Sequence, residues 1–330
     1  MPMLKPMQAA NDKPVLSKIN YPVLTSTKFD GVRFLIVDGK FLSKKMEPLH
    51  PVVTKRFKDI VELATSSGVI LDGEICAEGM KFHEITAAMA HEEDVGDLKL
   101  YVFDMVTVAE WKKNITWKNK EGAKAFEERV VDYQEWCDKN DPNQVKLVPV
   151  HHTVCHNEKA VQNEFDFNVK GGMEGIMLHC PKSPYIHSRA TAKQNIFWKM
   201  KQWTTISAKI VDFGQKGILT EEAKKTNTTK DNLGRTKRGH KKADRELVDE
   251  VGTVFVEIIA EQGFPEGLKC GVGFAKEAYD IRTEITWKNR KKYLGRHVDI
   301  VFQDGGIKDK PRFGRIVAFR PDLDEPIIPA

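Results

Sequence analysis

The chain has 330 residues, of which 41% are hydrophobic and 30% are charged. This composition is that of an ordinary globular protein with room for two domains, and it excludes a collagen-like or mainly disordered chain. The net charge of +5 permits a polyanionic partner without requiring one.

The cysteines are dispersed and form no Cys-x-x-Cys pair: Cys76, Cys137, Cys155, Cys180 and Cys270. Such a set indicates a reducing compartment and argues against a disulfide framework or a zinc ribbon. The first residues lack the apolar stretch of a signal peptide, and no later run is long enough to span a bilayer. We therefore expect a cytoplasmic protein with no membrane contact.

Strand and helix patterns alternate over the first 201 residues. Two strands are expected within residues 21–40, one on each side of the hexapeptide that begins at Lys28. Helical spacing covers residues 55–64, 82–89, 123–139 and 157–171. Strand patterns cover residues 69–75, 98–106, 145–150, 174–178 and 195–201.

From residue 204 onward the pattern changes to short strand-like runs separated by turns that contain glycine. These runs are residues 204–213, 252–259, 284–287, 298–302 and 314–319. Strands at this spacing predict a small β-barrel. We place the boundary near residues 202–204, which gives expected domains of residues 1–202 and 203–330.

The hexapeptide Lys-Phe-Asp-Gly-Val-Arg places Lys28 at the junction of a strand and a loop. A buried lysine held among other cations can lose its proton and act as a nucleophile. Arg33 stays charged and can bind phosphate or ribose oxygens, while Gly31 allows the backbone to approach a bulky ligand. Taken alone, the same residues also fit an ordinary surface turn.

Other polar and aromatic residues stand near the ends of the expected strands, and such ends can converge on one cleft. They are Asp30, Ser43, Lys44, Asp72, Glu74, Tyr101, Phe103, Asp104, Glu174, Lys199 and Lys201. Cations neutralise phosphates, carboxylates hold magnesium, and an aromatic ring stacks on a base. The cleft would therefore suit a nucleoside triphosphate.

Six motifs, KFDGVR, LSK, LDGE, YVFD, EGIM and WKMK, follow one another in this order. Their order and spacing resemble those of the ATP-dependent DNA ligases of the covalent nucleotidyltransferase superfamily, with the greatest likeness to the small bacteriophage-type enzymes. The likeness is strong over residues 21–201 and weak beyond. It implies an α+β fold, in which an adenylation domain of ATP-grasp-like antiparallel and mixed sheets with helices precedes an OB-fold β-barrel.

The resemblance implies a role for each matching residue. Lys28 matches the nucleophile that takes AMP from ATP. Lys199 and Lys201 match the pair that contacts the AMP phosphate, and we expect their charges to favour the neutral form of the nucleophile. Asp30 and Arg33 match residues that act at the ribose and at the nick phosphates.

The remaining matches concern the base, the ribose and the metal. Glu74 and Glu174 match carboxylates that bind the ribose or a divalent metal, so Mg²⁺ or Mn²⁺ is the expected cofactor beside ATP. Phe103 matches the aromatic residue that stacks on adenine, and Tyr101 is a second candidate. Asp72 and Asp104 can equally be structural acids.

The chain departs from the family pattern at two places. Lys44 follows Ser43 where the family usually has Ser-Arg, so a point charge replaces a bidentate guanidinium at phosphate or ribose. Near the end, Arg320-Pro-Asp-Leu only partly matches the family's terminal Arg-x-Asp-Lys. The sequence leaves open whether Arg315 or Arg320 serves as the family's terminal motif.

Residues 224–245 are rich in lysine and arginine. Lys237, Arg238, Lys241 and Lys242 are candidates for contact with the DNA backbone beside the barrel, and a solvated loop is the alternative reading. A second cluster, His151, His152, Cys155 and His156, fits no standard zinc spacing, so surface or core roles are favoured there.

We therefore expect a monomeric ATP-dependent DNA ligase that seals nicks in duplex DNA and serves repair, replication and recombination. A lysyl-AMP intermediate would pass AMP to the 5′-phosphate, which the 3′-hydroxyl then attacks. If the chain is phage-encoded, it would act in the host cytoplasm. The alternatives are an RNA ligase, an mRNA capping guanylyltransferase, or a non-catalytic OB-type nucleic-acid-binding protein. An NAD-dependent ligase is disfavoured, because the chain is short and has no four-cysteine zinc module.

Overall fold

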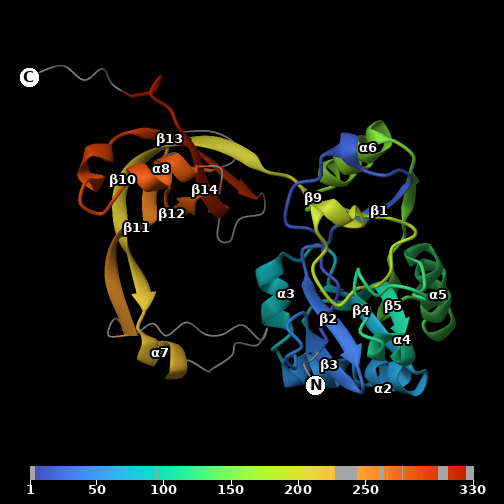
Figure 1. Ribbon diagram of the computed structural model, residues 1–330. Helices are drawn as coiled ribbons and strands as arrows, with labels where there is room; N and C mark the ends of the chain where they lie inside the picture. Colours follow the sequence, from blue (N-terminus) through green and yellow to red (C-terminus); the bar gives the residue numbers. More distant parts are fainter. Residues whose placement is uncertain are drawn as a thin grey trace, which may run out of the picture. The chain divides into compact units, whose positions relative to one another are not determined.

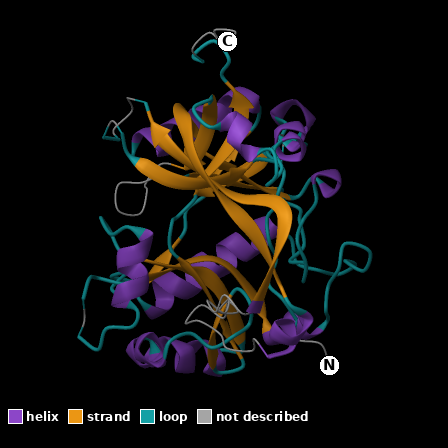
Figure 2. Ribbon diagram, turned by 90° about the vertical axis from the view of Figure 1, so that its left-hand side faces the viewer, coloured by secondary structure: helices purple, strands orange, loops and turns teal. Residues whose placement is uncertain are grey.

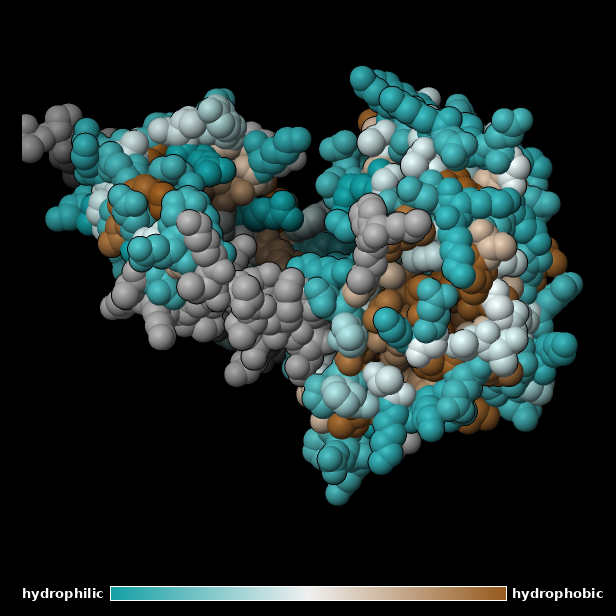
Figure 3. Space-filling model, turned by 60° about the horizontal axis from the view of Figure 1, so that its bottom comes forward, coloured by the Kyte–Doolittle hydropathy of each residue, from teal (hydrophilic) through white to brown (hydrophobic). Residues whose placement is uncertain are grey.

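The computed structural model describes residues 4–93, 95–226, 244–259, 264–265, 267–276, 278–303 and 311–324. These residues form two compact units, which meet in sequence between Lys201 and Gln202 (Figure 1). In Figure 3 hydrophilic side chains cover much of the face shown, with hydrophobic atoms between them. None of the described helices is long and apolar enough to cross a membrane.

The first unit contains a five-stranded sheet in the order β3-β2-β4-β5-β6. Its strands are β2 (Val32–Val37), β3 (Lys40–Ser43), β4 (Val69–Cys76), β5 (Lys99–Thr107) and β6 (Leu147–Pro149). All neighbours are antiparallel except β5 and β6, which are parallel. Phe34 and Ile36 pack into one hydrophobic core, and Leu35 and Val37 pack into another. The sheet is therefore buried on both faces, which explains the continuous apolar run of β2.

Helices of the first unit pack around this sheet, as Figure 1 shows. They are α1 (Pro51–Arg56), α2 (Lys58–Ser66), α3 (Phe82–Ala88), α4 (Val108–Lys112) and α5 (Phe126–Asn140). The single helix predicted over residues 55–64 is wrong in one respect. Phe57, with φ −105° and ψ 22°, separates α1 from α2, and its buried ring packs in the core beside Val53 and Ile60.

A second sheet in the first unit has the order β7-β1-β8-β9. Its strands are β1 (Val23–Thr27), β7 (Thr153–Cys155), β8 (Gly175–His179) and β9 (Phe197–Lys201), and all neighbours are antiparallel. Helix α6 (Glu158–Lys170) contacts β1, β7 and β8. Val161 of this helix shares a core with Val23, Ile176 and Trp198, so the helix covers one face of the sheet.

The second unit is a closed five-stranded barrel in the order β10-β11-β12-β14-β13. Its strands, drawn in orange in Figure 2, are β10 (Thr204–Leu219), β11 (Arg245–Ile258), β12 (Lys269–Phe274), β13 (His297–Gln303) and β14 (Arg312–Phe319). Alternate residues such as Ile206, Ala208 and Ile210 point into its core. Two short helices, α7 (Glu221–Thr226) and α8 (Tyr279–Glu284), accompany it. The predicted barrel is therefore present.

One expected strand of the barrel, residues 284–287, is wrong. Helix α8 ends at Glu284, and a turn follows in which the side chain of Asn289 accepts from Thr286 N at 2.8 Å and donates to Glu284 O at 2.8 Å. Strands β3, β7 and β12 were not predicted. Two are only three or four residues long, and β12 contains two glycines, so neither length nor composition signals a strand.

Candidate nucleotide site

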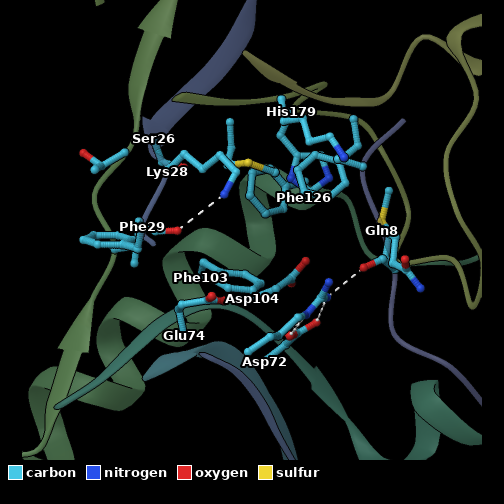
Figure 4. Close-up of a pocket in the computed structure, with 18 of the residues that line it drawn as sticks. Gln8, Ser26, Lys28, Phe29, Asp72, Glu74, Phe103, Asp104, Phe126 and His179 are labelled. Carbon is cyan, nitrogen blue, oxygen red and sulfur yellow. Dashed lines mark hydrogen bonds and ion pairs between the residues drawn. The ribbon is translucent and has the colours of Figure 1, made fainter. Parts of the chain in front are cut away.

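A pocket of about 290 Å³ lies in the first unit and is lined from both sheets. The second sheet contributes Lys199 and Lys201, the loop after β1 contributes Lys28, and the first sheet contributes Glu74 and Phe103. Figure 4 shows the ring of Phe103 between Lys28 on one side and Asp72 on the other. Residues from all six sequence motifs thus line the pocket, including Lys44 of LSK and Met177 of EGIM. Glu174 of EGIM contacts Lys28 beside it.

Two lysines share one carboxylate at this pocket. Lys28 Nζ donates to Glu174 Oε2, and Lys201 Nζ donates to Glu174 Oε1. The side chain of Lys28 is 18% exposed, that of Lys201 is 21% exposed and that of Glu174 is 10% exposed. Burial alone would raise the pKa of Glu174, but the charges of Lys28 and Lys201 and their hydrogen bonds lower it. Glu174 is therefore an anion that holds two ammonium groups close together.

The backbone at Gly175 explains how this cluster is built. Gly175 has φ +143°, and a Cβ there would lie 2.1 Å from Met200 O on the neighbouring strand. Lys28 N donates to Gly175 O at 2.9 Å, and Gly175 pairs with Lys201 across β8 and β9. A side chain at this position would separate the strands that carry Lys28, Glu174 and Lys201.

Arg33 is held by a second carboxylate. Its Nε and Nη2 donate to the two oxygens of Asp72 at 2.8 and 2.6 Å, and Tyr185 Oη donates to the same carboxylate at 2.6 Å. Burial opposes the charge of Arg33, but Asp72 outweighs this effect and raises its pKa. Asp72, only 3% exposed, is therefore a structural partner that orients Arg33 along the pocket wall.

Gly31 has a different role from the one expected. A Cβ at Gly31 would lie 2.3 Å from Ile75 O and 2.4 Å from Cys76 Sγ. The glycine is required because the hexapeptide lies tightly against β4. The expectation that Gly31 allows close approach to a ligand is therefore wrong, because its backbone approaches the neighbouring strand β4.

Glu74 lies opposite the lysines and has a strongly shifted pKa. Burial raises the pKa of Glu74 to about 7, although Lys28 and Arg33 act in the opposite direction. Figure 4 shows Glu74 beside Phe103 at the pocket. A carboxyl that gives up its proton near neutral pH in a cleft is a common feature of sites that bind cations or transfer protons.

Within the part of the chain that the structure describes, the Lys199 ammonium group has no hydrogen-bond or ion-pair partner. Burial, followed by the charges of Lys201, Arg189 and Lys28, lowers the pKa of Lys199 to about 8. Three basic side chains thus crowd Lys199, and an anion in the pocket would relieve their repulsion. The sequence prediction did not include Arg189, because no spacing pattern marks it.

The two candidate aromatic residues have separate surroundings. Phe103 lines the pocket, and the Arg33 guanidinium lies 5.3 Å from the centre of its ring. Tyr101 does not line the pocket; its ring packs 4.6 Å from that of Phe29. Of these two candidates, Phe103 is therefore the one that lines the pocket.

The remaining predicted residues differ in their surroundings. Lys44 is exposed and lines the pocket. Asp30 is half-buried outside the lining, and its charge acts on Lys201. Asp104 lines the pocket, but Arg129 donates to both of its oxygens at 2.7 and 3.0 Å, so it is a buried structural partner.

Part of the lining was not anticipated from the sequence. His179 is buried with its ring stacked 4.2 Å from that of Phe197, and Phe126 packs 3.6 Å from its other side. His152, from the cluster that suggested zinc, also lines the pocket; its Nδ1 lies 3.0 Å from Tyr133 Oη, and burial lowers its pKa to about 4. Residues 7–9 also line the pocket.

The acidic groups fit a metal that arrives with a nucleotide. Within the described residues, no group of three or more His, Cys, Asp or Glu side chains could hold an ion alone. Mg²⁺ is usually held by one or two carboxylates together with substrate phosphates. Glu74 can supply such a carboxylate above its pKa, whereas Glu174 already carries two ammonium groups.

Other predicted residues follow Gln202 in the sequence. Lys237, Arg238, Lys241 and Lys242 lie outside the described residues. Arg320 donates to Asp322 at 2.9 and 2.8 Å and to Asp299 at 3.2 Å within the barrel. Arg315 lies with its guanidinium 5.0 Å from the Trp203 ring centre.

The chain resembles known proteins over most of its length. Residues 2–201 match the family model of the ATP dependent DNA ligase domain. The solved structure named Pmar-Lig_PreS3 has a TM-score of 0.70 at 20% identity, over 97% of this chain and 68% of that chain. A structure from a study of Lig E DNA ligases has a TM-score of 0.60 at 17% identity, over 96% of this chain and 100% of that one.

A Chlorella virus DNA ligase-adenylate is 24% identical over 96% of this chain and 98% of that chain, with a TM-score of 0.48. No curated protein matches the sequence. The family match covers more than half of the chain and includes every residue around the pocket. The chain belongs to the ATP-dependent DNA ligases.

Proposed function

We propose that Lys28 is the residue that carries AMP in this ATP-dependent DNA ligase, and that the pocket beside it binds ATP. The observation that carries the proposal is the convergence of Lys28, Lys199 and Lys201 on one pocket with Phe103 and Glu74. A triphosphate needs cations, and its base needs a flat apolar partner. Both are supplied within the same cavity.

In the first step Lys28 Nζ attacks the α-phosphorus of ATP. A phosphorus–nitrogen bond forms, the bond to the bridging oxygen breaks and pyrophosphate leaves. The ammonium group gives up two protons to solvent and keeps one on the bonded nitrogen. The AMP then passes to the 5′-phosphate of a nick with release of Lys28. Attack by the adjacent 3′-hydroxyl forms the phosphodiester and expels AMP. Each step is an in-line transfer, so positioning and charge neutralisation supply most of the catalysis.

Glu174 controls when Lys28 can react. An ammonium group paired with a carboxylate is not a nucleophile, so Lys28 must leave Glu174 and lose a proton before attack. Phosphates that enter the pocket can pair with Lys201 and Lys199. Lys201 would then leave the Glu174 carboxylate that it shares with Lys28. Glu174 thus keeps Lys28 paired and unreactive until ATP binds.

Other residues take the rest of the nucleotide. Phe103 stacks on the base, while Lys199, Lys201 and Lys44 face the phosphates. Glu74, with Glu174 as the second candidate, would hold Mg²⁺ or Mn²⁺, which neutralises charge on the phosphates. Arg33, already oriented by Asp72, would contact the ribose or the nick phosphate, and Asp30 would act near Lys201.

We further propose that the two units are the two domains, residues 1–202 and 203–330, and that the barrel is an OB-fold. Its strand order and the parallel contact between β12 and β14 support this assignment. Gln202 and Trp203, between β9 and β10, are the proposed hinge for closure on DNA. We also propose that the protein is a monomer of the phage type. It would act in the cytoplasm, in DNA repair, replication and recombination.

Mass spectrometry tests the central proposal. The protein is incubated with ATP and Mg²⁺, digested, and searched for an added AMP. We expect the adduct on Lys28 and none on the Lys28→Ala variant. An adduct on another residue would exclude Lys28 as the nucleophile, whereas a GTP-derived adduct in a parallel reaction would indicate the capping reaction.

A further inference from the structure

The strongest unassigned feature is the segment of residues 5–10, which lies along the pocket and contacts both of its arginines. Gln8 pairs with Arg189 in a parallel β-bridge. Its backbone N donates to Ser188 O at 3.1 Å, and Ala190 N donates to Gln8 O at 2.7 Å. Ala10 N donates to Phe197 O at 3.0 Å, beside β9. The segment is therefore fixed on both sides of Gln8.

Both pocket arginines donate to this segment. Arg33 Nη2 donates to Met7 O at 2.7 Å, and Arg189 Nη1 donates to Ala9 O at 2.8 Å. Arg189 Nη2 donates to Gln8 Oε1, the one side-chain acceptor among these contacts. Figure 4 shows Gln8 at the side of the pocket opposite Phe29. Met7, Gln8 and Ala9 themselves line the cavity.

Arg189 lines the pocket but is an exposed residue, so its guanidinium needs hydrogen-bond acceptors to fix its position. A long exposed side chain loses rotamer freedom when it binds an anion, and this loss weakens binding. A guanidinium already fixed by two acceptors has lost that freedom beforehand. Its charge also acts on Lys199, so the position of Arg189 affects a second cation of the site.

We propose that Gln8 is a positioning residue that holds Arg189 in place for the phosphates of the bound nucleotide. This inference rests on the proposed function, because it requires ATP in the pocket. Gln8 acts through Arg189 and does not itself need to touch the nucleotide. Removal of its amide would leave Arg189 with only the carbonyl of Ala9 among the acceptors described above.

The test is a double-mutant cycle with Gln8→Ala, Arg189→Ala and the combined variant, in which the KM for ATP and the kcat of lysyl-adenylate formation are measured. Gln8→Ala should raise the KM about threefold to tenfold, the range for the loss of one typical hydrogen bond. In the Arg189→Ala background the same change should have almost no further effect. Asn11→Ala, an exposed residue of the same segment, is the matched control and should behave as wild type.

Two outcomes would overturn the inference. One is an unchanged KM in Gln8→Ala; the other is an equal loss in both backgrounds, which would mean that Gln8 acts independently of Arg189. Thermal unfolding of each variant separates a change in folding from a change in ATP binding. If wild-type protein forms no adenylate at all, the proposed function fails before the role of Gln8 is tested.

Discussion

Lys28 and Lys201 bind opposite oxygens of the Glu174 carboxylate, although Lys28 and Glu174 lie 146 positions apart in the chain. One carboxylate anion thus lies between two ammonium groups and offsets part of their mutual repulsion. The arrangement holds Lys28, the proposed nucleophile, next to the pocket where it would react. It also makes Glu174 important for the stability of the folded protein as well as for the chemistry.

Replacement of Lys28 by arginine should abolish the AMP adduct while the protein remains folded. Arginine keeps a positive charge for Glu174, but a guanidinium does not lose its proton in a protein and cannot attack phosphorus. Mass spectrometry after incubation with ATP measures the adduct, and thermal unfolding measures the fold. Adduct formation by Lys28→Arg would exclude Lys28 as the nucleophile.

The Glu174→Gln variant should be less stable by about 2 kcal/mol, because two partly buried ammonium groups lose their shared anion. High salt should restore part of this loss by screening the repulsion between Lys28 and Lys201. Chemical unfolding at two salt concentrations measures both effects. Glu62→Gln is the control: Glu62 pairs with Lys58 on the surface and is 67% exposed. A Glu174 variant as stable as this control would contradict the assignment.

The shifted pKa of Glu74 predicts a pH effect on stability. Its pKa is about 7 in the folded protein, above the value of 4.5 for an unperturbed glutamate, so the folded state binds the proton more tightly. The stabilisation is complete below pH 4.5 and is lost as the pH rises through 7. Glu74→Gln should flatten the change in unfolding free energy across this window. The exposed Glu78, changed to glutamine, should leave the profile unaltered.

Phe103→Ala should raise the KM for ATP about tenfold, because stacking of a base on an aromatic ring is worth about 1–3 kcal/mol. Phe103→Tyr keeps the ring and should retain most of the affinity. Tyr101→Phe removes only a hydroxyl from a ring that does not line the pocket, and should leave the KM unchanged. A larger loss in Tyr101→Phe than in Phe103→Ala would reverse the assignment of the base-stacking ring.

Neutralisation of Lys237, Arg238, Lys241 and Lys242 to glutamine should weaken binding to nicked DNA and make it less dependent on salt. Each lost phosphate contact makes the negative slope of log K against log salt shallower by about 0.9. Fluorescence anisotropy at several salt concentrations measures the slope, with adenylate formation as a control for the first unit. An unchanged slope would mean that the basic segment does not lie along the DNA backbone.

Most of the secondary structure of the first unit could be predicted, because long amphipathic helices and apolar strands have clear periodic patterns. Helix 158–170 and strand 69–76 fall within two residues of their predicted limits. The prediction failed where the local signal was weak: at Phe57, where one helix becomes two, and at residues 284–287, where a helix end and a turn replace the expected strand. In both cases packing and turn hydrogen bonds outweigh the local preference.

The sequence by itself determined the family and the candidate residues, because its six motifs resemble those of the ATP-dependent DNA ligases in order and spacing. Only the tertiary structure decided which partners they have. It paired Arg33 with Asp72 and Asp104 with Arg129, separated Phe103 from Tyr101, and placed Gln8 beside Arg189. Such contacts join residues from distant parts of the chain, and they depend on strand register and burial, which no local pattern records.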